Sequence, residues 1–276
     1  MSSGDIWEKA SKIYAEKAKL MTYPFARTIL DEANKVLPLT DPDTHVLDVG
    51  CGSGAIANAL AKAFPGVKML AVDWSAAMLE IVNSQKLPNV ETRQVNGMNL
   101  TPILASQPKG FTHVFSNFMN QFTPDPFQPI KEMIRAARSD GVIGLSSWGS
   151  FDILTMFTSA AQSVDPSWQS PGPWATKEFP ETAPLIENIF RSWGLIEVTS
   201  REKVVTFDFK TINEVLDYFF ESGNPAMMRL INDFKDSHSV EALERVRQVM
   251  LESIGPGKWD VTALKGRGFM TIGRKP

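Results

Sequence analysis

The chain is poor in the residues that mark secreted, membrane or nucleic-acid-binding proteins. One cysteine among 276 residues allows no intramolecular disulfide, as is typical of a reducing compartment. The formal net charge is −3, whereas nucleic-acid binding normally requires a basic face. No run approaches the roughly 20 apolar residues of a membrane span, and residues 1–9 lack the apolar core of a signal peptide. We therefore expect a cytoplasmic protein with no nucleic-acid partner, no membrane partner and no metal.

What the chain does contain is a glycine loop between a predicted strand and a predicted helix. Residues 46–54 read Val-Leu-Asp-Val-Gly-Cys-Gly-Ser-Gly, and an alanine-rich helix is predicted over residues 55–64. Glycines at alternate positions let the backbone turn tightly and approach a ligand, because they carry no Cβ. The helix that follows directs free N–H groups and a partial positive charge toward the same place. The segment therefore predicts a ligand site.

The carboxylate before this loop indicates which ligand it binds. Gly50, Gly52 and Ala55 also satisfy the relaxed dinucleotide fingerprint. Asp48, two residues before the first glycine, would repel a pyrophosphate but attract an ammonium or a sulfonium group. The combined pattern favours S-adenosyl-L-methionine over NAD. Asp48 as a helix cap is the alternative, and Cys51 is expected to be a buried filler rather than a reactive thiol.

The segment from Asp48 to Gly54 resembles the first motif of the class I S-adenosylmethionine-dependent methyltransferases. In that family an acidic residue ends the second strand and binds both ribose hydroxyls. Here the apolar run of residues 68–72 is closed by Asp73. Two acceptor oxygens suit a vicinal diol, so the chemistry agrees with the resemblance. Capping of the helix that begins near Ser75 is a second role open to Asp73.

The resemblance continues along the next two predicted strands. Asn96 stands where the family often has an acid that accepts from the adenine amino group, and an amide oxygen accepts the same bond. Met98 would lie against the adenine ring, and residues 113–118 resemble the strand that ends beneath the reactive methyl group. A plain turn role stays open for Asn96 and Asn117. The implied cofactor-binding residues are Asp48, Gly50, Cys51, Gly52, Gly54, Asp73, Trp74, Met78, Asn96, Gly97, Met98 and Asn117.

Short apolar runs alternate with helical patterns, which predicts an α/β fold with parallel strands and crossover helices. The resemblance implies a doubly wound, mostly parallel, seven-stranded sheet (class I methyltransferase, Rossmann-like) with its last strand antiparallel at the edge. Ligands on such sheets bind beyond the carboxyl ends of the strands, where the motif residues fall. Strands are predicted at residues 45–49, 68–72, 90–95, 112–116, 142–146, 195–199 continuing at 204–209, and 268–273.

We expect one domain over residues 1–276, with a cofactor-binding core at 40–150. Cap helices are predicted at residues 1–38, near 6–20 and 24–36. Lid insertions are predicted at 151–180, as a long loop after a short helix, and at 211–254, as about three helices. Together they form a helical lid over the carboxyl edge. Aromatic side chains expected in a substrate pocket, with core packing as the alternative, are Tyr14, Phe118, Phe122, Trp148 and Trp174.

Histidine, the usual general base, is almost as scarce as cysteine. His45 and His113 begin predicted strands and so lie at the edge away from the ligand. His238 lies in the inserted helices, where a solvent-facing position is expected, although it could reach the pocket. The loop carboxylates of Asp125, Asp152 and Glu178 stay open as bases, and no catalytic residue is assigned.

Methyl transfer is an in-line displacement, for which proximity and exclusion of water supply much of the catalysis. Without a dedicated base, the acceptor is expected to be acidic: a thiol, a phenol or an enol of a small-molecule substrate. The chain resembles fungal secondary-metabolite methyltransferases such as the epidithiodiketopiperazine dithiol S-methyltransferases, while O-methylation of an aromatic polyketide stays equally open. A non-catalytic or regulatory S-adenosylmethionine binder, or a methyltransferase fold recruited to a pericyclic or cyclisation reaction, are the alternatives. A monomer or homodimer is expected.

Overall fold

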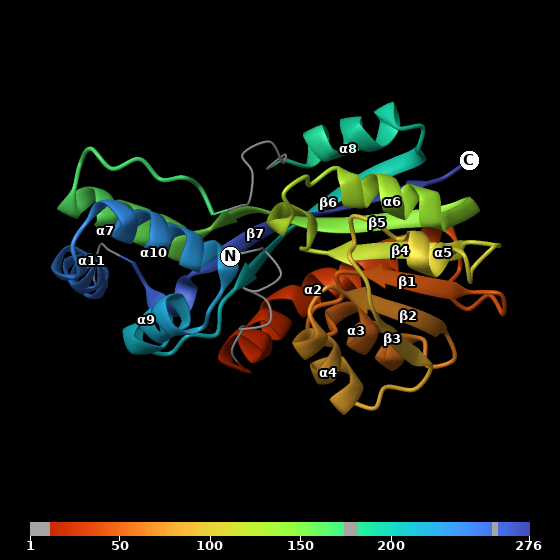
Figure 1. The fold of residues 1–276 in the computed structure, drawn as a ribbon, viewed down its shortest axis with the longest axis horizontal. Coiled ribbons are helices and arrows are strands. Elements are labelled where there is room, and N and C mark those ends of the chain that lie inside the picture. The colour runs from red at the N-terminus through yellow and green to blue at the C-terminus, as the bar shows by residue number, and fades with distance from the viewer. Residues whose placement is uncertain (1–11, 174–181, 256–258) are drawn as a thin grey trace.

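The computed structural model describes residues 12–173, 182–255 and 259–276, with side chains from residue 21 onward. Its centre is a seven-stranded sheet in the order β3-β2-β1-β4-β5-β7-β6 (Figure 1). The predicted doubly wound, mostly parallel sheet is therefore confirmed. The strands are β1 (His45–Val49), β2 (Lys68–Asp73), β3 (Val90–Gln94), β4 (Phe111–Asn117), β5 (Ala137–Phe151), β6 (Ile196–Thr206) and β7 (Lys265–Arg274).

The last strand is antiparallel, as predicted, but its predicted position at the edge is wrong. β7 pairs with β5 on one side and with β6 on the other, so β6 forms the edge. Burial explains the arrangement. Every residue of β7 from Gly268 to Gly273 is buried, which requires neighbours on both sides and both faces, whereas most of β6 is exposed.

Helices cover both faces of the sheet. In Figure 1, α2, α3 and α4 lie below it, whereas α6 and α8 lie above it. Successive residues of β1 point to opposite faces of the sheet, so Val46 belongs to one apolar cluster and Leu47 to another. The helices are α2 (Lys12–Val36), α3 (Ala55–Ala63), α4 (Ala76–Ser84), α5 (Thr101–Leu104), α6 (Gln128–Ala136), α7 (Asp152–Val164), α8 (Ala183–Ser192), α9 (Ile212–Glu221), α10 (Pro225–Ser237) and α11 (Val240–Glu252).

The two helices predicted near the N-terminus are one helix over the described part. α2 runs through Pro24, where a break was expected. Phe25 and Ile29, one turn apart, are fully buried, and α2 packs along β5 and β7. This packing outweighs the backbone hydrogen bond that proline removes. The helix therefore reaches the carboxyl edge of the sheet as one piece.

Four helices pack together beside the sheet, within the two predicted lid insertions, and are called the lid. α7, α9, α10 and α11 lie together at the left of Figure 1. Their core contains Phe157 stacked on Phe219, with ring centroids 4.7 Å apart. The three helices predicted between residues 211 and 254 are α9, α10 and α11, and α7 lies where a short helix is predicted at the start of the other insertion. β5 continues to Phe151 and leads directly into α7.

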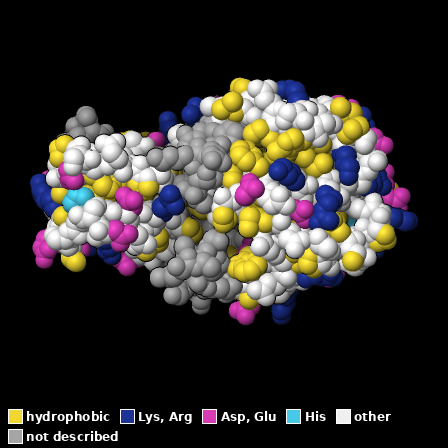
Figure 2. Space-filling view, turned by 45° about the horizontal axis from the view of Figure 1, so that its top comes forward, with side chains coloured by type: hydrophobic (Ala, Val, Ile, Leu, Met, Phe, Trp, Pro, Cys, Tyr) yellow, Lys and Arg dark blue, Asp and Glu magenta, His cyan; other side chains and the backbone are white. Residues whose placement is uncertain are grey.

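The surface carries charges of both signs. On the face that Figure 2 shows, Lys and Arg side chains are interspersed with Asp and Glu side chains. No helix within the described ranges has the length and apolar content needed to cross a bilayer.

Gly268 allows α2 to pack against the sheet, which gives a test of the fold. A Cβ at this position would lie 2.7 Å from Cε1 of Phe25 and 3.0 Å from the carbonyl oxygen of Ser147. We expect Gly268→Ala to lower the free energy of unfolding by about 1–3 kcal/mol, measured by urea titration. Gly66→Ala is the matched control, because its Cβ would have no neighbour within 4 Å. Equal stability of the two variants would contradict this account of the packing.

Candidate functional site

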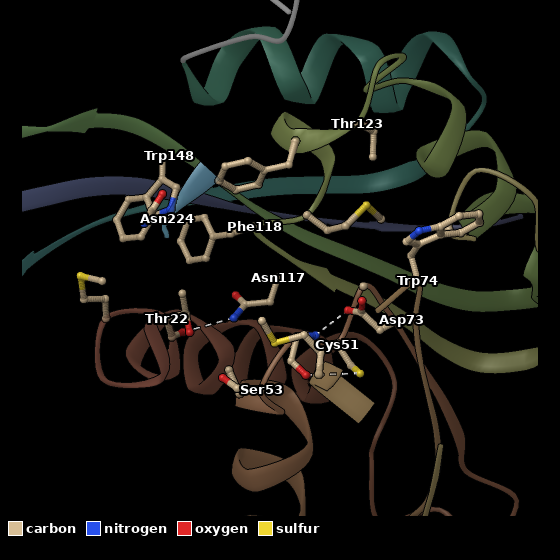
Figure 3. Close-up of a pocket in the computed structure, with 18 of the residues that line it drawn as sticks. Thr22, Cys51, Ser53, Asp73, Trp74, Asn117, Phe118, Thr123, Trp148 and Asn224 are labelled. Atoms are coloured by element: carbon tan, nitrogen blue, oxygen red, sulfur yellow. Dashed lines mark hydrogen bonds between the residues drawn. The ribbon is translucent and has the colours of Figure 1, made fainter. Parts of the chain in front are cut away.

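A cavity of about 340 Å³ lies at the carboxyl ends of the parallel strands (Figure 3). The loops after β1, β2, β3 and β4 form one part of its wall, and α2, the end of β5 and the lid form the rest. Its volume falls within the range of small-molecule sites, about 300–1,000 Å³. The predicted residues on its wall are Gly50, Cys51, Gly52, Asp73, Trp74, Met78, Asn96, Gly97, Met98, Asn117, Phe118, Phe122 and Trp148.

Other wall residues were not predicted, and two predicted ones cannot be placed. Trp174 and the side chain of Tyr14 lie outside the described part of the structure. Asn224 precedes Pro225 at the start of α10, a pattern that signals a helix start but not which cavity the residue borders. The wall residues missed from sequence are Met21, Thr22, Ser53, Ala55, Met119, Thr123, Pro124, Phe151, Tyr218 and Asn224.

The glycine loop adopts a backbone that requires glycine. Gly50, Gly52 and Gly54 have φ angles of +69°, +52° and +88°. A Cβ on Gly50 would overlap the side chain of Met119, whereas one on Gly52 would have no neighbour within 4 Å. Gly52 therefore presents its backbone to the cavity. Gly54 caps the start of α3, where a Cβ would lie 3.2 Å from the side chain of Val82 in α4, and it is not among the residues that line the cavity.

Asp73 ties this loop to the end of β2. Its Oδ2 accepts the N–H of Gly52 at 2.8 Å, and its Oδ1 accepts the N–H of Ser75 at 2.9 Å. The cap of α4 is Ser75, whose hydroxyl accepts the N–H of Met78 at 3.2 Å. One carboxylate therefore fixes two neighbouring loops at the cavity, while a different residue takes the capping role.

Asp48 lies inside the sheet rather than on the cavity wall. It is fully buried in β1 between Ala71 and Phe115 of the flanking strands. Within the described part of the chain, neither carboxylate oxygen has a hydrogen-bond partner. Burial, and next the charge of Asp73, raise the pKa of Asp48 well above its usual value. Asp48 is therefore not among the residues that line the cavity, and the alternative of a helix-capping role is wrong, because Gly54 is the N-cap of α3.

Cys51 is the buried residue that the sequence predicts. It is 6% exposed beside the cavity, and burial followed by the charge of Asp73 raises the pKa of its thiol well above the usual value. The thiol is therefore neutral near pH 7 rather than a reactive thiolate.

One end of the cavity is formed by the loops after β2 and β3. Trp74 is 51% exposed at the rim, and its carbonyl oxygen accepts the Nε2–H of Gln94 at 2.9 Å. Asn96 accepts the N–H of Met98 at 2.9 Å, so it has the turn role that the sequence left open. Trp74, Asn96 and Met98 all line the cavity. This end combines an aromatic face, a thioether and an amide.

Asn117 joins three elements where β4 ends. Its Oδ1 accepts the hydroxyl of Ser146 on β5 at 2.7 Å, and its Nδ2 donates to the carbonyl oxygen of Thr22 on α2 at 3.4 Å (Figure 3). Phe118, the next residue, has a φ of +63°, which is uncommon for a residue with a side chain. This backbone turn lays its ring on Trp148, with centroids 4.1 Å apart and planes 16° apart.

The opposite end of the cavity is an aromatic wall formed by Phe118, Trp148 and Phe151. The ring centroids of Trp148 and Phe151 are 5.0 Å apart in an edge arrangement. Gln121 fixes the wall from behind: its Oε1 accepts the N–H of Trp148 at 2.6 Å, and its Nε2 donates to the same residue's carbonyl oxygen at 2.9 Å. Gln121 is fully buried. No local sequence pattern predicts this support, because it joins residues 27 positions apart.

Charge is scarce on the cavity wall. Of the described lining residues, Asp73 alone carries a charged side chain, and none is Lys, Arg or His. His113 is buried at the amino end of β4, where it bonds the carbonyl oxygen of Leu37, and burial lowers its pKa to about 4. His238 neither lines the cavity nor faces solvent freely, because it pairs with Asp165 at 2.9 Å and stacks on Phe234.

Two of the loop carboxylates considered as bases, Asp125 and Asp152, are not among the residues that line the cavity. Asp125 accepts the N–H groups of Phe127 and Gln128, while Asp152 accepts the N–H of Lys265 at 2.7 Å. Glu178 lies outside the described residues. These bonds give Asp125 and Asp152 roles in local structure.

Part of the chain is similar to known methyltransferases. Residues 46–141 match a family model described as "Methyltransferase domain". The chain is 30% identical over 145 residues to trans-aconitate 2-methyltransferase of Azoarcus sp. strain BH72, covering 51% of this chain and 50% of that protein. It is 26% identical over 308 aligned positions to methyltransferase ktnA of Aspergillus niger, covering 95% and 94%. The chain thus spans about half the length of the Azoarcus relative.

Two solved structures have a similar fold. Phosphoethanolamine N-methyltransferase 2 of Haemonchus contortus, in complex with phosphomonomethylethanolamine and S-adenosylhomocysteine, has a TM-score of 0.57. It is 16% identical, over 100% of this chain and 60% of that one. The YcgJ protein of Bacillus subtilis has a TM-score of 0.54 at 16% identity, over 91% and 98%. At these identities the likeness concerns the fold.

The orphaned carboxylate of Asp48 predicts a pH dependence of stability. An acid whose pKa is raised on folding lowers the free energy of unfolding as pH rises from about 3.9, its usual pKa, through the folded value. We expect Asp48→Asn to remove this decline, because the amide cannot ionise. Urea titrations of both proteins from pH 5 to pH 8 measure the difference. The exposed Asp43→Asn is the control, and a slope in Asp48→Asn equal to that of the wild type would contradict the assignment.

Proposed function

We propose that the chain binds S-adenosyl-L-methionine and methylates a small molecule, because residues 46–141 match a methyltransferase-domain model and the sheet has the class I, Rossmann-like fold. The acceptor is an oxygen or sulfur atom on an uncharged aromatic compound. One observation carries the proposal: a single cavity joins the glycine loop and Asp73 to an aromatic wall, with no cationic side chain among its described lining residues.

The residues at the glycine-loop end fit S-adenosyl-L-methionine. Asp73 offers carboxylate oxygens for the ribose diol, and Trp74 and Met98 offer faces for the adenine ring. Asp48 is compatible with the same cofactor, because a cation bound at the neighbouring glycine loop would favour the ionised form of its partnerless carboxyl group. The bound cofactor supplies an electrophilic methyl group on a sulfonium cation.

At the aromatic end of the cavity, the chain positions the acceptor and excludes water rather than supplying a general base. Phe118, Trp148 and Phe151 offer faces and edges to a planar ring. Cys51 and Tyr218 have raised pKa values because both are buried, so neither is ionised near pH 7. An acceptor that loses its own proton suits such a wall, which favours a thiol, a phenol or an enol. The chain then holds the nucleophile in line and excludes water.

The same wall disfavours a polycarboxylate acceptor. Trans-aconitate, named in the Azoarcus relative, carries three carboxylates, each of which needs a cation or several donors once it leaves water. Asp73, the one charged residue on the described wall, has the wrong sign. We therefore place the acceptor among uncharged aromatic compounds such as secondary metabolites, in a cytoplasmic enzyme that is a monomer or homodimer.

Asp73 gives a direct test of the cofactor site. We expect Asp73→Ala to weaken S-adenosylhomocysteine binding by about 1–3 kcal/mol in calorimetric titration, because charge-assisted hydrogen bonds to the ribose are lost. Ser75→Ala is the control for altered loop structure, because Ser75 caps the neighbouring helix and its side chain does not line the cavity. An unchanged dissociation constant in Asp73→Ala would remove Asp73 from the site.

A panel of acceptors tests the reaction. We expect methylated products, detected by mass spectrometry, from 7-hydroxycoumarin, 2-naphthol or thiophenol with S-adenosyl-L-methionine, and none from trans-aconitate. Efficient methylation of trans-aconitate would contradict the charge argument. Cofactor binding without any methylated product would favour the regulatory alternative, and turnover that leaves the methyl group on the cofactor would favour a recruited fold.

A further inference from the structure

Two lid residues bring polar groups to the otherwise aromatic end of the cavity. Tyr218 comes from α9 and Asn224 directly precedes α10; their exposed fractions are 1% and 8%. Both line the cavity. In Figure 3, Asn224 lies beside Trp148 and Phe118, across the cavity from Asp73 and Trp74. The pair therefore faces the acceptor end from the lid.

The start of α10 fixes the orientation of the Asn224 side chain. Its Oδ1 accepts the N–H of Ala226 at 2.9 Å, which makes Asn224 the N-cap of the helix. The amide oxygen is thereby committed to the backbone, so the NH₂ group faces Tyr218. Nδ2 donates to the Tyr218 hydroxyl oxygen at 3.3 Å. A flipped amide would set a donor against the Ala226 N–H and lose the cap.

This orientation leaves the proton of Tyr218 for the cavity. Because its oxygen accepts from Asn224, the O–H must find another acceptor, and no described protein group accepts it. A buried hydroxyl whose proton has no acceptor loses hydrogen-bonding free energy that it would have in water. Burial also raises the pKa of Tyr218, so the phenol stays protonated. The pair is thus a neutral, oriented hydrogen-bond donor on a wall whose other contacts are mostly apolar.

We propose that Tyr218 determines specificity by donating a hydrogen bond to a neutral carbonyl oxygen of the aromatic acceptor, at the end remote from the transferred methyl group. The inference rests on the proposed function for the identity of the site. A carbonyl fits better than a carboxylate, because a neutral phenol cannot compensate a buried charge. A remote oxygen fits better than the nucleophile, because Tyr218 stands on the lid, whereas the cofactor residues belong to the core.

The experiment compares two bicyclic phenols that differ in this oxygen. 7-Hydroxycoumarin has a lactone carbonyl remote from its hydroxyl group, whereas 2-naphthol has none. Each is titrated by calorimetry into protein saturated with S-adenosylhomocysteine, for the wild type and three variants. Tyr218→Phe removes the hydroxyl. Asn224→Asp keeps a good N-cap but offers an acceptor to the Tyr218 proton, drawing it away from the ligand. Tyr23→Phe, a tyrosine off the cavity wall, is the control.

We expect Tyr218→Phe and Asn224→Asp each to weaken 7-hydroxycoumarin binding about tenfold, with 2-naphthol binding unchanged within about twofold. Tyr23→Phe should leave both constants unchanged. Equal losses for the two ligands would show a structural role, and failure of the wild type to bind 7-hydroxycoumarin would also refute the inference. If the binding pattern holds but no product forms, the inference stands and methyl transfer fails. If both phenols are methylated and Tyr218→Phe keeps the wild-type preference between them, methyl transfer stands and the inference about Tyr218 fails.

Discussion

The two hydrogen bonds accepted by Asp73 are the constraint on which the site depends. They join the N–H of Gly52 in the first loop to the N–H of Ser75 at the start of α4. Because the glycine loop has positive φ angles at three positions, it needs an anchor of this kind to hold one shape. That shape presents bare backbone to the cavity. Asp48, two residues before Gly50, is buried in β1, and its burial raises the pKa of its carboxyl well above the usual value.

The acceptor end is built on a different principle. Trp148 is held by both polar groups of Gln121 and is covered by Phe118, whose backbone adopts an uncommon φ to reach it. The lid adds Tyr218 and Asn224 from the far side. Rigid aromatic faces with one oriented donor favour a flat, uncharged ligand over a flexible anion. Ligand recognition at the glycine-loop end thus depends on the charge of Asp73 and on exposed backbone, whereas recognition at the aromatic end depends on shape.

Local patterns predicted much of the core of the fold, since β1, β2 and β4 are short, mostly buried runs and the loop after β1 is rich in glycine. The strand range of β1 and the roles of Gly50 and Gly52 follow from neighbouring residues alone. Contacts between elements that lie far apart in the sequence could not be predicted from such local patterns. The edge position of β6, the unbroken α2 at Pro24 and the burial of Asp48 depend on tertiary packing, which no window of sequence contains.

The acceptor end shows the same limit. Phe118, Phe122 and Trp148 were predicted, because they follow strands that end at the ligand edge. Tyr218 and Asn224 were missed, because a helix pattern shows which residues are buried but not which cavity they border. Calorimetric titration of the wild type with S-adenosyl-L-methionine, S-adenosylhomocysteine and NAD tests the central claim most directly. The account predicts micromolar binding of both sulfur ligands and no binding of NAD; binding of NAD alone would contradict it.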